Sequence, residues 1–156
     1  MADFDGAWLW EEYLASLLKE KGFEHPENKK KSGVIHPFTT KQVGKFYPDF
    51  YKAKVGHNLS EELADVILDA KYKDFDKKNP PADDLAQMIS YIHVMDASRG
   101  EFIYPSREKT EADKPWTVRP FATTSAEIGT RPFWIPQEAK DYSEFRKMIE
   151  ESEEQI

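Results

Sequence analysis

Residues 64–73 read Ala-Asp-Val-Ile-Leu-Asp-Ala-Lys-Tyr-Lys, a short apolar run that ends with a carboxylate and an ammonium group two positions apart. The run predicts a β-strand, in which alternate side chains share one face of a sheet. Positions 66, 68 and 70 then point to one side, and positions 67, 69 and 71 point to the other. We therefore expect Asp69 and Lys71 to lie side by side on one face, where the apolar run ends.

A second carboxylate lies twenty residues upstream, at Asp49 in the run Tyr47-Pro48-Asp49. The turn at residues 56–60 joins two predicted strands, 46–54 and 64–73, and a hairpin of these strands brings Asp49 across from Asp69. Two carboxylates on one sheet face can ligate a divalent metal ion, and a lysine beside them can position or activate a water molecule. The alternative is that Pro48 and Asp49 form an ordinary turn.

The composition fits one domain over residues 1–156, because 156 residues with 39% hydrophobic and 13% aromatic side chains can bury a core. No apolar run approaches the ~20 residues that span a bilayer, and the N-terminus is acidic where a signal peptide is basic. We expect a cytoplasmic protein that makes no membrane contact. The absence of cysteine excludes disulfides and thiolate-bound zinc or iron–sulfur clusters.

The formal net charge of −7 argues against a simple nucleic-acid-binding module. The charge is unevenly distributed, because residues 28–54 hold seven lysines and one acid, Asp49. One interpretation is a solvated loop. The other is a patch that contacts a nucleic-acid backbone, formed by Lys29, Lys30, Lys31, Lys41 and Lys45.

Two helices flank the predicted strands. Residues 7–21 carry a buried stripe at helical spacing, which Gly22 should end. Glu11 lies at the edge of that stripe and could face inward, but a charge at the rim of a surface helix is the simpler interpretation. A second helix begins near residue 82, with a predicted core stripe of Leu85, Met88, Ile89 and Ile92. Gln87 and Tyr91 lie off this stripe and share one helix face. The simpler interpretation is that both are polar residues at the protein surface.

The other predicted elements are shorter. Strands are expected at 34–38, 101–104 and 118–123, and a Pro-interrupted extended segment at 131–136. Asp141 or Ser143 should cap a last helix that docks through Phe145, Met148 and Ile149. The acidic tail at 150–155 is expected to fray.

The order of these motifs resembles the PD-(D/E)xK nuclease superfamily over residues 7–105. Its elements are a helix, a strand with Pro-Asp, a strand with Asp-x-Lys, a helix with Gln-x-x-x-Tyr, and a strand. The runs at 9–13, 47–49, 66–73 and 102–105 look most like McrC, the nuclease subunit of modification-dependent restriction systems. The resemblance implies an α/β, restriction-endonuclease-like fold, in which helices flank a mixed central sheet and residues 106–156 form a C-terminal extension.

The resemblance also implies a role for each matched residue. Asp49 and Asp69 would ligate Mg²⁺ or Mn²⁺, and Glu11 would complete or support the metal site. Lys71 would position or activate the attacking water, and Gln87 and Tyr91 would orient that lysine or contact DNA. The expected activity is hydrolysis of DNA phosphodiester bonds by an endonuclease, with a GTPase or ATPase motor as a partner. A homodimer, or a pair bound to the motor, is expected if both strands are cut.

Two other functions fit the same motifs. One is a RecB-like repair or recombination exonuclease on the same fold, which would depend on free DNA ends. The other is a non-enzyme, either an inactive nuclease fold that serves as an interaction module or an acidic DNA mimic that occupies the DNA site of another protein, although Asp49, Asp69 and Lys71 are all present.

Overall fold

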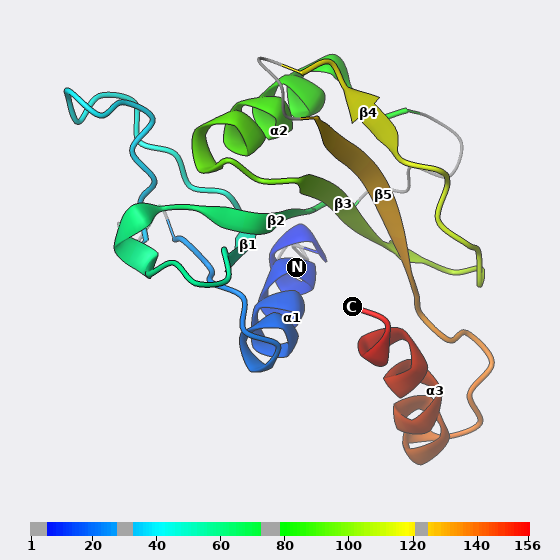
Figure 1. Cartoon of the computed structure of the whole chain (residues 1–156). Helices are drawn as coiled ribbons and strands as arrows, with labels where there is room; N and C mark the ends of the chain where they lie inside the picture. Colours follow the sequence, from blue (N-terminus) through cyan, green and yellow to red (C-terminus); the bar gives the residue numbers. More distant parts are fainter. Residues whose placement is uncertain (1–5, 28–32, 73–78, 121–124) are drawn as a thin grey trace, which may run out of the picture.

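The computed structural model describes residues 6–27, 33–72, 79–120 and 125–156. These residues form a five-stranded sheet with helices on both faces (Figure 1). The helices are α1 (Gly6–Glu20), the short 3₁₀ helix η1 (Leu59–Glu61), α2 (Ala82–Met95) and α3 (Tyr142–Glu154). The strands are β1 (Phe50–Ala53), β2 (Ala64–Ala70), β3 (Arg99–Ser106), β4 (Trp116–Val118) and β5 (Ala126–Trp134).

The sheet is mixed, with the strand order β1-β2-β3-β5-β4. The central strands β2, β3 and β5 are parallel, whereas β1 and β4 are antiparallel edge strands. Parallel neighbours need a long crossover, and α2 provides it between β2 and β3. This arrangement confirms the predicted α/β, restriction-endonuclease-like fold.

Strand β2 divides its side chains between two hydrophobic cores, as its alternation predicts. Ile67 packs in the core beneath α2, together with Met88 and Met95. Leu68 packs in the opposite core, together with Leu14 of α1 and Ile149 of α3. The molecule therefore has three layers, with α2 on one face of the sheet and α1 and α3 on the other.

Helix α1 matches its prediction closely. Trp10, Leu14 and Leu18 are buried, and the helix ends in a Schellman motif at Gly22, whose φ is +86°. The Phe23 amide donates to the Leu18 carbonyl at 3.0 Å, and the Gly22 amide donates to the Lys19 carbonyl at 3.2 Å. Gly22 is needed there because this backbone conformation disfavours residues with a Cβ atom.

The predicted stripe of α2 is wrong in part. Ile89 is 42% exposed, whereas Tyr91 belongs to the core beneath the helix. The buried positions are Met88, Tyr91, Ile92 and Met95, so the true stripe is centred to one side of the predicted one. Gln87 is exposed, as predicted for a surface polar residue.

Several predicted boundaries also differ from the structure. The segment at 34–38 makes only an isolated bridge between Ile35 and Phe46, and the strand predicted at 46–54 is reduced to β1. The strand predicted at 118–123 appears as β4 at 116–118, and residues 121–124 lie outside the described part. The most consequential omission is the first half of β5, which pairs with β3 from Glu127 to Trp134.

The acidic tail does not fray as predicted. Residues up to Glu154 remain helical, the Ser152 hydroxyl donates to the Trp134 carbonyl at 2.7 Å, and the Tyr13 hydroxyl donates to Glu153 at 2.9 Å. Asp141 caps the start of α3, because its carboxylate accepts from the Glu144 amide at 2.8 Å. These contacts fix α3 against β5 and α1.

A buried ion pair joins the middle of the sheet to this C-terminal helix. The Glu101 side chain is 4% exposed and accepts hydrogen bonds from Nε and Nη2 of Arg131, the latter at 3.0 Å. Arg131 also donates to the Gln155 carbonyl at 2.8 Å, and Arg99 contacts Glu101 from the exposed side. Burial alone would raise the pKa of Glu101, but the two guanidinium groups outweigh it and lower that pKa.

We expect Arg131→Met to destabilise the protein by about 2 kcal/mol, because it leaves a buried carboxylate short of hydrogen-bond donors and releases the end of α3. Urea unfolding at pH 7 measures the change. The matched control is Arg99→Met, whose side chain is 45% exposed and which should cost less than about 1 kcal/mol. Equal effects of the two substitutions would contradict this assignment.

Candidate active site

The site is built on the antiparallel pairing of β1 with β2. Phe50 pairs with Leu68, so the preceding residue, Asp49, lies opposite Asp69. The Asp49 carboxylate extends this pairing past the end of β1, because its Oδ2 accepts from the Ala70 amide at 2.8 Å. The predicted approach of the two aspartates is confirmed.

Lys71 lies next to Asp69, just beyond the end of β2. Its Nζ is 2.9 Å from Asp69 Oδ2 and 3.2 Å from Asp84 Oδ1, in the first turn of α2. The Lys71 amide donates to the Ile103 carbonyl at 2.9 Å, which continues the ladder with β3. Burial would lower the pKa of Lys71, but the two aspartates outweigh it and raise that pKa.

The surroundings of Asp49 favour its protonated form. Burial, a hydrogen bond to Asp69 and the negative charges of Asp69 and Glu11 raise the pKa of Asp49 to about 9, against the lowering effect of the Ala70 amide. Asp49 is therefore protonated at neutral pH, and its hydroxyl donates to Asp69. Two crowded carboxylates in a buried position are an environment in which a cation can replace the shared proton.

Glu11 lies close to this pair, on α1. Burial raises the pKa of Glu11, His25 opposes that rise, and the negative charge of Asp69 adds to it. Glu11 is therefore within electrostatic reach of the aspartates. In the described ranges, however, no three His, Asp or Glu side chains are arranged to hold a metal ion. A ligand role for Glu11 stays a prediction.

His25 is a site residue that the sequence analysis missed. Its Nδ1 lies 2.6 Å from the Asp49 carbonyl oxygen, and its ring stacks on Phe50 with centroids 4.6 Å apart. Its Nε2 lies 3.9 Å from a carboxylate oxygen of Glu11. His25 thus links the backbone of Asp49 to α1. No local sequence signal marks it, because it lies in a polar segment and acts only through tertiary contacts.

Asp84 was also missed. Asp83 and Asp84 both lie in the first turn of α2, and only the placement of α2 over β2 selects Asp84 as the partner of Lys71. Tyr91 lies near the same group, since its pKa is raised to about 12 by burial and by the charges of Asp49 and Asp69. Gln87 is on the exposed face of α2.

The predicted lysine patch is described in part. Lys41 and Lys45 are exposed, whereas Lys29, Lys30 and Lys31 lie outside the described residues. Contact of these lysines with a DNA backbone stays a prediction.

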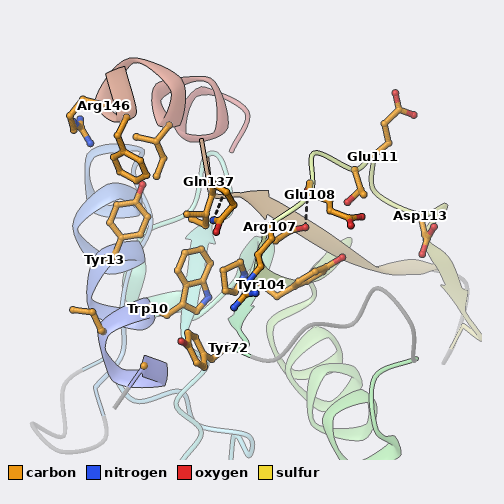
Figure 2. A pocket seen from close by; sticks show the side chains of 18 residues that line it. Trp10, Tyr13, Tyr72, Tyr104, Arg107, Glu108, Glu111, Asp113, Gln137 and Arg146 are labelled. Carbon is orange, nitrogen blue, oxygen red and sulfur yellow. Dashed lines mark hydrogen bonds between the residues drawn. The ribbon is translucent and has the colours of Figure 1, made fainter. Parts of the chain in front are cut away.

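An open cavity of about 1200 Å³ lies beside the site, between the ends of α1, β3 and α3 (Figure 2). Its lining includes Trp10, Tyr72, Tyr104 and Arg107, but not the two aspartates or Lys71. Tyr72, which lines the cavity, follows Lys71 directly in the chain, so the cavity lies next to the carboxylate–lysine group. We place the chemistry at the smaller group because its side chains are in direct contact there.

The mixed five-stranded sheet with its flanking helices defines a restriction-endonuclease-like fold. A family model described as "McrBC 5-methylcytosine restriction system component" matches residues 4–105, which is more than half of the chain. The chain belongs to this McrBC family.

A solved structure shares the fold. It is a refined half-complex from a tetradecameric assembly of Thermococcus gammatolerans McrB AAA+ hexamers with bound McrC, and the TM-score is 0.58 at 16% sequence identity. The match covers 97% of this chain and 34% of the matched chain, so this chain spans about a third of that length. A comparison with curated proteins gave no match. Among the described segments, no helix has the length and apolar character needed to cross a membrane.

The shared proton predicts a pH dependence of stability. Because the pKa of Asp49 is about 9 in the folded protein and about 3.9 for an unfolded aspartate, the folded protein binds the extra proton between these values. Its free energy of unfolding should therefore fall as pH rises from about 4 towards 9. Asp49→Asn keeps a donor for Asp69 and an acceptor for the Ala70 amide, and it should remove this dependence.

Urea unfolding in EDTA at pH 5 and pH 8 measures the effect. At pH 8 we expect Asp49→Asn to be more stable than the wild type by about 0.5–2 kcal/mol, the usual gain from a single stabilising substitution. Asp113→Asn, at an exposed aspartate, is the control. Parallel pH profiles for wild type and Asp49→Asn would show that the pair holds no proton.

Proposed function

We propose that this protein is a Mg²⁺-dependent or Mn²⁺-dependent endonuclease domain that hydrolyses phosphodiester bonds of DNA in a restriction system. The observation that carries the proposal is the contact of Asp49, Asp69 and Lys71 at the end of β2. Membership of the McrBC family supports it, and so does the resemblance of the motif order in the sequence to the PD-(D/E)xK superfamily.

The donor set fits a hard divalent cation. Asp49 and Asp69 would hold the ion through carboxylate oxygens, with Glu11 in support from α1, and these are the ligands that Mg²⁺ prefers. When bound, the ion supplies charge neutralisation at the phosphate and a lowered pKa of the attacking water. The proton that Asp49 carries in the metal-free protein would be released on loading.

Lys71 provides a fixed cation beside this pair. Its contacts with Asp69 and Asp84 hold it protonated, so its proposed role is to orient the water and to stabilise negative charge that develops on the phosphate. Asp84 positions the ammonium group from α2. Tyr91 packs behind the group, and Gln87 would contact the DNA strand from the exposed face of the same helix.

The proposed partners are DNA and a motor. The matched structure contains McrC bound to McrB AAA+ hexamers, and we extend this association to the present chain as part of the proposal. Two copies of the site are needed to cut both strands, which a homodimer or a motor-bound pair would provide.

The first experiment is cleavage of circular plasmid DNA. We expect nicked or linear product with Mg²⁺ or Mn²⁺ and no product with EDTA. Ca²⁺ should support binding without turnover, because its looser coordination misplaces the water. Efficient cleavage in EDTA would exclude the metal mechanism. Cleavage of linear DNA alone would favour the exonuclease, and no cleavage of either DNA would favour an interaction module.

The second experiment exchanges Lys71 for alanine and separately for arginine. Alanine should lower the single-turnover cleavage rate about 10²–10³-fold, the usual loss on removing one preorganised charged group. Arginine should restore little of it, because its planar group does not reproduce a compact ammonium.

The matched control is Lys54→Ala. Lys54 is likewise held by two oxygen atoms, although both belong to one residue, Asp96 (Oδ2 at 2.8 Å and the carbonyl at 3.0 Å), and it follows the end of β1 that is remote from Asp49. The Lys54→Ala variant should cleave DNA at the wild-type rate. Full activity of Lys71→Ala would make Lys71 an ordinary lysine at a strand end.

A further inference from the structure

Residues 36–45, called the 36–45 loop below, form an exposed projection with a fixed base. Ile35 and Phe46 close the base through two backbone hydrogen bonds of 2.8 and 2.9 Å, and Ile35 is 1% exposed. At its start, Glu62 accepts from the His36 amide at 3.0 Å and contacts the His36 ring at 2.6 Å. Figure 1 shows the loop, in cyan, extending away from the sheet.

The base of the loop adjoins the proposed active site. Phe46 is three residues before Asp49 and packs edge-on against Tyr91, with ring centroids 5.5 Å apart. Tyr91 lies within electrostatic reach of Asp49 and Asp69. The base of the 36–45 loop therefore lies next to the two aspartates.

The loop combines exposed apolar and cationic side chains. Phe38 and Val43 are each 58% exposed, and Lys41 and Lys45 are exposed beside them. No acid occurs from Asn28 to Pro48 in a chain with 29 acidic residues. A polyanion is therefore the complementary partner for this surface.

The two limbs of the loop lie against each other. Gly44 turns the chain with a φ of +68°, and a Cβ at Gly44 would lie 3.5 Å from the Pro37 side chain. A ribbon of two chain segments fits the major groove of B-DNA, which is about 12 Å wide, but not the minor groove, which is about 6 Å wide. Apolar side chains in the major groove can contact the thymine C5-methyl group.

We propose that the 36–45 loop enters the major groove of duplex DNA next to the scissile phosphate. Lys41 and Lys45 contact phosphates at the rims of the groove, and Phe38 and Val43 contact base edges. This inference rests on the proposed function, and it adds an apolar contact that the lysine patch alone does not supply.

The test measures the Kd for duplex DNA in Ca²⁺ at several salt concentrations, with the full chain. Phe38→Ser/Val43→Ser should weaken binding about tenfold at every salt concentration and leave the salt slope unchanged, because it removes uncharged contacts. The plot of log binding constant against log salt concentration falls less steeply when phosphate contacts are lost. Lys41→Gln/Lys45→Gln should therefore reduce the magnitude of this slope by about 2, one for each phosphate contact. Trp116→Ser/Tyr142→Ser, at exposed positions on β4 and α3, is the matched control and should bind like the wild type.

Binding to two duplexes that differ only in the thymine methyl groups tests whether the loop enters the major groove. An alternating dA–dU duplex lacks the methyl groups of the dA–dT duplex, so the wild type should bind it more weakly, and Phe38→Ser/Val43→Ser should bind both equally. Wild-type affinity of Phe38→Ser/Val43→Ser for DNA would overturn the proposal, as would equal wild-type binding to the two duplexes. Loss of binding only to the AAA+ partner would identify the loop as a protein interface and would overturn it too.

The two proposals fail differently. If the wild type cuts plasmid DNA with Mg²⁺ while Phe38→Ser/Val43→Ser binds and cuts equally well, the loop inference is wrong and the endonuclease stands. If the wild type binds duplex DNA with the expected loop dependence but cuts none, the endonuclease is wrong and the loop contact stands.

Discussion

The antiparallel pairing of Phe50 with Leu68 sets the geometry of the candidate site. A slip of one residue would turn Asp49 to the other face of the sheet, away from Asp69. The register is held from both faces, because Phe50 is buried with α1 on one side and Tyr51 is buried with α2 on the other. Tyr51 also exchanges backbone hydrogen bonds with Glu24, which fixes the outer edge of β1.

The parallel pairing of β2 with β3 determines where α2 and its Asp84 lie relative to Lys71. It requires a crossover, and α2 packs closely on β3 because Gly100 has no side chain. A Cβ atom at Gly100 would lie 2.5 Å from the sulfur of Met88. The crossover also brings the first turn of α2 to the end of β2, where Asp84 meets Lys71. One topological requirement thus places the helix, the aspartate and the lysine together.

The sequence predicts the elements whose buried side chains repeat at a regular spacing. It does not predict the features that depend on contacts between residues far apart in the chain. The alternation around Asp69 and the stripe of α1 are readable because each buries one regular face. Strand β5 is hidden because Gly129 and Pro132 interrupt its pattern, and pairing with β3 compensates for both. Ile89 and Tyr91 exchange their expected roles because the Tyr91 ring packs against Phe46, from a segment that precedes β1. His25 and Asp84 act only through such contacts.

The internal pairing of charges bears on how a chain of net charge −7 would bind a polyanion. At the site, Asp49 carries a proton, and Lys71 is shared by Asp69 and Asp84. Glu101 is neutralised by two arginines inside the sheet. Helix α3 carries five glutamates against Arg146 and Lys147, so it has a net negative charge, and it lies on the opposite face of the sheet from α2. In the proposed function, repulsion from that face and attraction at the 36–45 loop act in the same direction, and they orient DNA towards the aspartates.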